Sequence, residues 1–188
     1  MSLVPAGEWY DYEVTYLKMP EPPVQPPRAL PDGARLELTE SPDADLFLSF
    51  YARVGAEYEW RDKLDVPRSE VEEYIAQPGR PLYVLRLPDG REGGFFLLDF
   101  TEMPVADLAY FGLLPEAVGG GYGRALLEQA VSLLWAQHGV TEVTVNTCTL
   151  DHPRALALYT SVGFRPGKKV WMSRVLTRPR SAPLQKSS

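Results

Sequence analysis

A run of glycines near the middle of the chain is the feature whose residue types and spacing most directly suggest chemistry. The run and its flank consist of Gly119, Gly120, Gly121, Gly123 and Arg124, placed between an apolar stretch and an amphipathic helical pattern. Glycine lets the backbone approach a ligand closely and reaches positive φ at little steric cost. A helix start directs unpaired N–H groups and the positive end of its dipole toward one point. The segment therefore predicts a cradle for a phosphate group.

Three kinds of phosphate-binding loop compete for this segment. A dinucleotide loop needs G-x-G-x-x-G, and a nucleoside triphosphate loop needs G-x-x-x-x-G-K-[ST]. Counted from Gly119, the third glycine position of the first pattern is occupied by Arg124, and no Lys-Ser or Lys-Thr pair follows. Neither pattern is complete, so both interpretations are weakened. This favours the third kind, a loop that holds the pyrophosphate of coenzyme A.

A second motif further along the chain supports this third interpretation. It consists of residues at fixed spacing in a helical pattern: Ala155, Leu158, Tyr159, Gly163 and Phe164. With Gly121-Tyr122-Gly123 before it, the chain resembles, over roughly residues 82 to 173, the acetyl-CoA-binding core of the GNAT superfamily of N-acetyltransferases. The loop of that family reads Q/R-x-x-G-x-G/A, and its later helix reads A-x-x-L-Y-x-x-x-G-F.

The resemblance implies both a fold and an activity. The fold is α/β (α+β), with a GNAT-like central mixed sheet that is mostly antiparallel and flanked by helices on both faces. The activity is transfer of an acetyl group from acetyl-CoA to a primary amine, by direct attack in a ternary complex. The acceptor is expected to be a small-molecule or peptide amine. The alternatives are an acyltransferase that uses another acyl donor or a hydroxyl acceptor, and a non-catalytic sensor that binds acyl-CoA.

Two residues are expected to carry the chemistry. Tyr159 matches the tyrosine that commonly protonates the leaving thiolate in this family, and its alternative role is to pack its helix on the sheet. Asp107 begins a strand where relatives often carry an acidic residue, so it is the candidate general base, with Asp99 as the alternative. Cys148 offers a covalent acetyl-cysteine route, but that route needs an activating base, and a small core residue is the simpler interpretation.

The resemblance also assigns the residues that contact the cofactor. They are Phe111, Leu113, Val118, Gly119, Gly120, Gly121, Gly123, Arg124, Asn146 and His152. For Asn146, contact with the substrate and packing beside the strand that opens in this family are equal alternatives. Phe111 and Leu113 are expected to contribute backbone groups. Val118 stands where the family usually has Gln or Arg, which removes a side-chain contact to phosphate and leaves the backbone contacts. His152 stands where the family often has Asn, and its alternative role is to cap a helix.

The acceptor amine is expected to meet a different part of the chain. Loops and early helices set substrate choice in folds of this kind. Tyr58, Trp60 and Arg61 form an aromatic and charged cluster in such a loop, and they are the candidate substrate-binding residues.

Composition limits the classes of protein that fit. A chain of 188 residues with 45% hydrophobic residues suits a single domain. Its net charge of −6 argues against broad nucleic-acid binding, which needs Lys and Arg to neutralise phosphates. Two histidines and one cysteine argue against a zinc site, and no apolar run approaches the ~20 residues of a membrane helix. We expect a cytoplasmic monomer or homodimer that uses no metal and binds neither nucleic acid nor membrane.

Periodicity predicts the elements that position these residues. The expected strands are 12–17, 34–38, 82–87, 94–100, 107–114, 142–148 and 168–175. The expected helices are 41–54, 69–75, one between the glycine run and Gly139, and one that Asp151 and Pro153 begin. The third of these helices carries an apolar stripe formed by Leu126, Leu127, Ala130, Val131 and Leu134.

Three segments follow from this pattern. Residues 34–176 are predicted to form the acetyltransferase domain. Residues 1–33 are predicted to form an N-terminal strand and a stiff strap, because six prolines fall within residues 20–31. Residues 177–188 are basic and rich in Ser and Pro, and this composition predicts a disordered tail.

Overall fold

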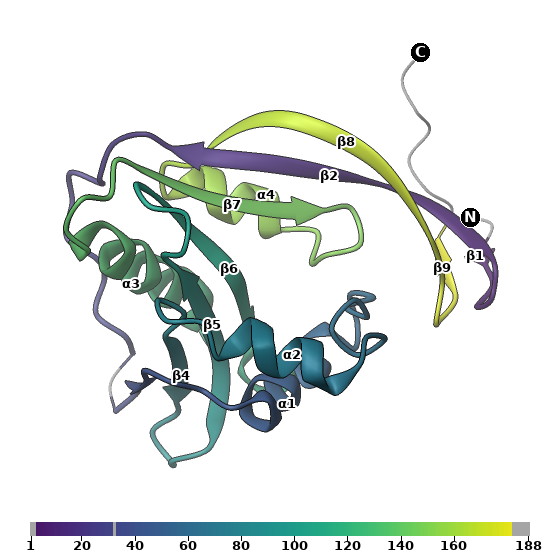
Figure 1. Cartoon of the computed structure of the whole chain (residues 1–188), viewed down its shortest axis with the longest axis horizontal. Coiled ribbons are helices and arrows are strands. Elements are labelled where there is room, and N and C mark those ends of the chain that lie inside the picture. The colour runs from purple at the N-terminus through teal and green to yellow at the C-terminus, as the bar shows by residue number, and fades with distance from the viewer. Residues whose placement is uncertain (1–2, 32, 182–188) are drawn as a thin grey trace.

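A computed structural model describes residues 3–31 and 33–181. Each strand and helix expected from the sequence has a counterpart in it, with shifted bounds, and two short strands at residues 3–4 and 180–181 were not expected. The strands are β1 (Leu3–Val4), β2 (Trp9–Met19), β3 (Arg35–Thr39), β4 (Leu82–Arg86), β5 (Glu92–Asp99), β6 (Val105–Leu113), β7 (Glu142–Cys148), β8 (Arg165–Val175) and β9 (Arg180–Ser181). The helices are α1 (Ala44–Gly55), α2 (Arg68–Ile75), α3 (Tyr122–Ala136) and α4 (Ala155–Ser161), with a short 3-10 helix at Pro115–Ala117. Figure 1 shows their arrangement.

The main sheet has the strand order β3-β4-β5-β6-β7-β2-β8. Every neighbouring pair is antiparallel except β6 and β7, which are parallel. The expectation of a mixed and mostly antiparallel sheet is therefore confirmed.

Helices cover both faces of this sheet, and β5 shows why. Successive side chains of a strand point to opposite faces. Phe95 and Leu97 are buried in the cluster that contains α1 and α2. Phe96 and Leu98 are buried in the cluster that contains α3 and Tyr159 of α4. A strand with apolar residues at successive positions is thus buried from both sides, as the three-layer arrangement requires.

Strands β6 and β7, which form the parallel pair of the main sheet, separate along their length. Among the described residues, β6 and β7 pair at three positions, from Val105 opposite Glu142 to Asp107 opposite Thr144. Beyond Asp107, β6 continues to pair with β5 on its other side, with a register shift between Leu97 and Leu98. The edge of β6 that faces β7 is consequently left without a strand partner over its second half.

Helix α3 starts close to this opening and is anchored firmly. Its buried side chains are Ala125, Leu126, Leu127, Ala130, Val131 and Leu134, which includes the whole predicted apolar stripe. Burying a leucine fully stabilises a fold by about 1.5–3 kcal/mol, so the leucines of this stripe hold the helix in one position. The N-terminus of α3 is therefore a fixed feature of the opening.

The two ends of the chain add a long arched pair to the sheet. Strand β2 lies between β7 and β8, so residues before 34 complete the main sheet, and Figure 1 shows β2 and β8 arching past the end of β7. The predicted tail differs from the structure at residues 177–181. The backbone N–H of Thr177 donates to the buried carboxylate of Glu59, and β9 pairs with β1. Residues 182–188 of the predicted tail lie outside the described residues.

Candidate active site

A cleft of about 830 Å³ occupies the opening between β6 and β7. It is lined by Leu108 to Leu113 of β6, by Val145, Asn146 and Cys148 of β7, by the glycine loop, and by Tyr159 of α4. Residues from the segment after α1 and from β2 and β8 complete its walls. The cleft therefore joins the glycine loop, the unpaired edge of β6 and the predicted catalytic tyrosine in one space.

The glycine loop forms one end of the cleft. Gly119 and Gly121 have positive φ angles of 87° and 81°, and a Cβ atom built on either would meet nothing within 4 Å. Backbone conformation alone therefore requires glycine at these positions. Gly121 immediately precedes α3, so the N–H groups of the first helical turn open toward the cleft. Gly123 and Val118 also line the cleft.

Gly120 belongs to the loop but is not among the residues that line the cleft. A Cβ atom at Gly120 would lie 2.7 Å from Cε2 of Tyr122, so the small size of Gly120 leaves room for that ring. Its contact with the cofactor stays a prediction.

Arg124 lines the cleft, and its guanidinium donates hydrogen bonds to residues of α3 and α4. Its Nε donates to Oε1 of Glu128 at 2.8 Å, and its Nη atoms donate to Oγ and the carbonyl oxygen of Ser161. The guanidinium thus ties α3 to the end of α4. Its positive charge adds to the dipole of α3 at the end of the cleft that the glycine loop forms.

The middle of the cleft is a strand edge. Phe111 and Gly112 pair with Phe96 and Phe95 of β5, and their other backbone edge faces the opening. An unpaired strand edge presents N–H and C=O groups that an extended amide-containing chain can pair with. Across the opening, Asn146 of β7 is exposed and lines the same space.

Tyr159 is buried at the junction of α4 and the opened strands. Its side chain is 7% exposed, and its ring contacts those of Phe111 and Phe164 at centroid distances of 6.2 and 5.9 Å. Burial raises the pKa of Tyr159 well above its ordinary value, so the phenol stays protonated at physiological pH.

Asp107 lies at the apex of the opening. It is not among the residues that line the cleft, although Leu108 is. The hydroxyl of Thr144 donates to Oδ1 of Asp107 at 2.5 Å. Burial raises the pKa of Asp107 to about 6, against the effect of this hydrogen bond and with a smaller contribution from the charge of Asp99. A carboxylate with this pKa holds a proton more readily than an exposed aspartate does.

Asp99, the alternative base, is occupied by other partners. Nε of Arg80 donates to Oδ2 of Asp99 at 2.7 Å, and Thr101 donates to Oδ1. Although burial opposes it, these hydrogen bonds and the charge of Arg80 lower the pKa of Asp99. A carboxylate that is ionised and fully bonded in this way is a poor proton acceptor.

The predicted substrate cluster divides in the structure. Tyr58 and Trp60 line the cleft. Arg61 does not, and it pairs with Asp65 four residues later. The indole of Trp60 packs against two rings that sequence reasoning missed, Tyr51 and Tyr110, with centroid distances of 5.4 and 5.8 Å. Tyr51 and Tyr110 also line the cleft, so aromatic rings of four residues, with Tyr58 and Trp60, form part of its wall.

Asp151 was predicted to begin the last helix, but it holds the cleft wall together. Nε1 of Trp60 donates to Oδ1 of Asp151 at 3.1 Å, while Thr147 and the backbone N–H of Cys148 donate to Oδ2. Helix α4 instead begins after Arg154, whose backbone N–H donates to Nδ1 of His152. His152 therefore satisfies a helix-start donor and also lines the cleft.

Cys148 lines the cleft as a free thiol. Burial, with a smaller contribution from the neighbouring carboxylate of Asp151, raises the pKa of Cys148 to about 12. The nucleophilic form of cysteine is the thiolate. The covalent route is therefore disfavoured relative to direct attack by the acceptor.

The described residues hold no metal-binding group and no membrane-spanning helix. No cluster of three or more His, Cys, Asp or Glu side chains suited to a metal ion is found within residues 3–31 and 33–181. In that same part of the chain, no helix is both long enough and apolar enough to cross a membrane.

Comparison with known proteins identifies relatives of this arrangement. The family model described as the acetyltransferase (GNAT) family matches residues 47–164. No curated protein matches the chain. Solved structures with a similar fold include GCN5-related N-acetyltransferases from Kribbella flavida, at 16% identity and a TM-score of 0.59, and from Sphaerobacter thermophilus, at 18% and 0.59. A tandem GNAT protein from the clavulanic acid biosynthesis pathway gives 22% and 0.58.

These matches differ in length from the chain. The superpositions cover 86%, 96% and 86% of this chain, but 56%, 55% and 53% of the three solved chains. The chain thus spans little more than half the length of these structures. At such identities, the likeness establishes the fold.

Proposed function

Because the chain belongs to the acetyltransferase (GNAT) family, we propose that it transfers an acetyl group from acetyl-CoA to a primary amine, by direct attack in a ternary complex. The observation that carries the proposal is that one cleft holds both the anion cradle at Gly121 and the buried phenol of Tyr159. A pyrophosphate suits the first, and a thiolate leaving group needs a proton donor such as the second.

The opened strand explains how the two ends of the cleft act on one ligand. A pantetheine arm is extended and carries amides, which match the unpaired backbone groups of β6 between Leu108 and Leu113. With its pyrophosphate at Gly119 and Gly121, the arm would run along this edge toward Tyr159. The residues present therefore fit acetyl-CoA as the co-substrate.

Each step of the transfer has a candidate group in the chain. The neutral acceptor nitrogen bonds to the thioester carbon, the carbon–sulfur bond breaks, and Tyr159 gives its proton to the departing sulfur. The proton that the nitrogen loses as the amide forms returns to the Tyr159 oxygen and restores the phenol. The amine must lose a proton to react, and an alkylamine with a pKa near ~10.4 is only about 0.1% neutral at physiological pH. We assign the removal of that proton to Asp107, whose pKa is raised by burial to about 6.

Thermal unfolding in the presence of different cofactors tests the donor. Acetyl-CoA and coenzyme A should stabilise the protein, whereas NAD and ATP at equal concentration should not. A ligand at ~100 times its dissociation constant adds about 2.7 kcal/mol to the free energy of unfolding, which produces a clear rise in melting temperature. Stabilisation by NAD or ATP alone, or by none of the four compounds, would contradict an acetyl-CoA site.

A further inference from the structure

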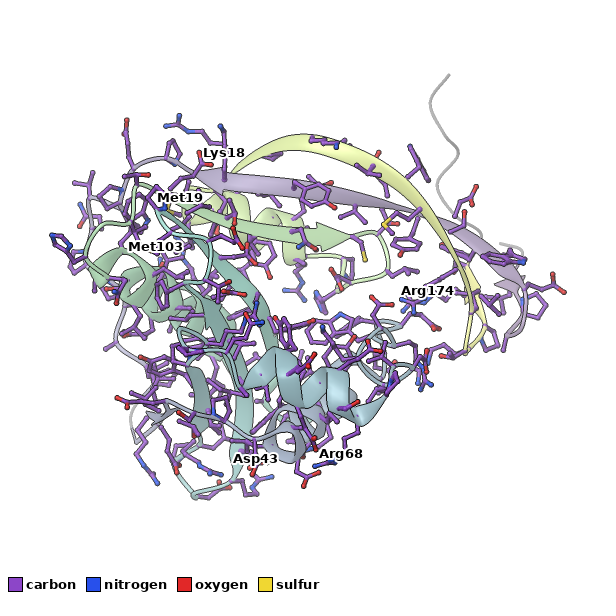
Figure 2. All side chains as sticks on the ribbon, in the orientation of Figure 1. Lys18, Met19, Asp43, Arg68, Met103 and Arg174 are labelled. Carbon is purple, nitrogen blue, oxygen red and sulfur yellow. The ribbon has the colours of Figure 1, made fainter. Side chains whose placement is uncertain are left out.

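The cleft lined by Tyr51, Trp60 and Tyr110 also contains a cation, Arg174, whose guanidinium is only partly paired. Arg174 lies on β8, its side chain is 17% exposed, and it lines the same cleft as Tyr159. Its Nε atom is buried and has no hydrogen-bond partner among residues 3–31 and 33–181. Figure 2 shows the Arg174 side chain beneath the arch of β2 and β8, facing the segment that follows α1.

The protein partner of Arg174 is weak. One Nη atom lies 3.4 Å from Oδ1 of Asp62, and the Asp62 side chain is 83% exposed. An ion pair at this distance, with its carboxylate in solvent, is held only weakly. Asp62 can therefore turn into solvent at little cost and leave the guanidinium to another anion.

The other carboxylates that line this end of the cleft are already bonded. Glu59 accepts hydrogen bonds from the backbone and hydroxyl groups of Thr177. Asp151 accepts from Trp60, Thr147 and Cys148. Within the described part of the chain, neither carboxylate bonds to Arg174, so the guanidinium can pair with one further anion.

Arg180 shows that a buried, unpartnered Nε is not by itself a binding site. It also has a buried Nε without a partner among the described residues. However, its Nη atoms donate to the carbonyl oxygens of Leu150 and Glu57, and Arg180 does not line the cleft. Arg180 ties the end of the chain to the loops, whereas Arg174 faces the space where an acceptor must sit.

The surroundings of Arg174 are otherwise aromatic. Tyr12 and Tyr51 line the cleft beside it. Burial raises the pKa of both phenols, and the charge of Arg174 partly offsets the rise, which is consistent with a guanidinium close to both rings. A guanidinium held among such rings gains from an anionic partner that stays in place.

We propose that the acceptor is a primary amine that also carries a carboxylate, and that Arg174 binds this carboxylate through its two Nη atoms. The planar fork of a guanidinium matches the two oxygens of a carboxylate, which makes such pairs strong and directional. The rings of Tyr12, Tyr51 and Trp60 surround the apolar body of the acceptor. This inference rests on the proposed function and narrows its substrate to an amino acid or a short peptide.

The test compares acids with their amides in three proteins. Wild type, Arg174→Gln and Lys169→Gln receive acetyl-CoA with each standard amino acid, with dipeptides, and with the matching amides, and thiol release gives kcat/KM. Lys169 is on the same strand, pairs with Glu13 at the surface and does not line the cleft, so it controls for loss of one charge. Because acids and amides differ in amine pKa, the informative quantity is the ratio of wild type to variant.

Arg174→Gln should lower kcat/KM about 10- to 100-fold for the preferred acid and by less than about 3-fold for its amide. Lys169→Gln should change neither. Arg174→Lys, which keeps the charge and loses the fork, should fall between wild type and Arg174→Gln. Preference for free amino acids over dipeptides, or the reverse, identifies the source of the carboxylate. Equal loss for acid and amide, or no loss for either, overturns the inference while the transferase function stands.

A binding measurement separates failure of the inference from failure of the function. If neither acids nor amides release thiol but another primary amine does, the inference fails and the transferase function stands; if no primary amine releases thiol, the transferase proposal fails. Calorimetric titration of N-acetylated amino acids and their amides, with coenzyme A present, still tests Arg174. Tighter binding of the acids by wild type than by Arg174→Gln supports the inference, and equal binding by both proteins refutes it.

Discussion

Replacing Tyr159 with phenylalanine should lower kcat by about 100-fold or more and leave the affinity for coenzyme A nearly unchanged. General acid catalysis by a positioned side chain contributes about 100- to 10,000-fold, and the variant lacks only the hydroxyl that supplies the proton. The ring contacts with Phe111 and Phe164 persist because phenylalanine has the same ring. Steady-state thiol release and calorimetric titration with coenzyme A measure the two quantities.

A second tyrosine provides the control for this substitution. Tyr83 of β4 also stacks on a buried ring, that of Phe96, at a centroid distance of 4.8 Å, and it does not line the cleft. Tyr83→Phe should therefore retain full turnover. If Tyr159→Phe also retained full turnover, Tyr159 would serve only in packing, and the leaving sulfur would take its proton from solvent.

The second large effect is expected at the glycine loop. Gly121→Val should weaken coenzyme A binding at least about 10-fold, because a β-branched residue strongly disfavours the φ of 81° that this position adopts. The loop would relax to another conformation and withdraw N–H groups from the phosphate position. The added side chain meets no neighbour within 4 Å of its Cβ, so the effect comes from backbone conformation.

Gly90 offers a matched control for strain alone. It has a φ of 85°, its Cβ position is also open, and it lies in the turn between β4 and β5, outside the cleft. Gly121→Val and Gly90→Val should both lose about 1–2 kcal/mol of unfolding free energy in urea. Only Gly121→Val should lose coenzyme A affinity. Equal loss of affinity in both variants would assign the effect to stability and not to the cradle.

The local parts of this account were predictable from the sequence. The glycine run lies in a loop with two left-handed glycines, and α3 buries the predicted stripe, because both depend on residues within one or two turns of each other. Tyr159 follows the same logic, since its motif fixes its face on a short helix beside Phe164. Patterns of this kind report local conformation directly.

The parts that depend on distant pairing were not predictable. Arg174 and Tyr12 reach the cleft because β8 and β2 pair with each other far from the glycine loop in sequence. Arg61 looked like a cleft residue from its neighbours, but a local ion pair with Asp65 turns it away. Alternation of Tyr10, Tyr12 and Val14 in β2 was the available signal for an inward face, yet it does not say which strands lie beside it.

Asp107 illustrates the same limit at the site of chemistry. Its sequence position at a strand start placed it near the opening, and the structure puts it at the last paired position of β6 and β7. Its hydrogen bond comes from Thr144 of β7, a strand more than thirty residues later, and its pKa is raised by burial and by Asp99 of β5. The electrostatics of a site depend on such tertiary neighbours.

The most direct test of the central claim is a turnover experiment in which acetyl-CoA and a panel of primary amines are both varied. The account predicts that free thiol and N-acetylated amine appear in equal amounts, only when both substrates are present, with intersecting double-reciprocal lines. Parallel lines with acetylated Cys148 would replace direct attack by a covalent route. Acetyl-CoA that binds but releases no thiol with any amine would contradict the claim that this chain is an N-acetyltransferase.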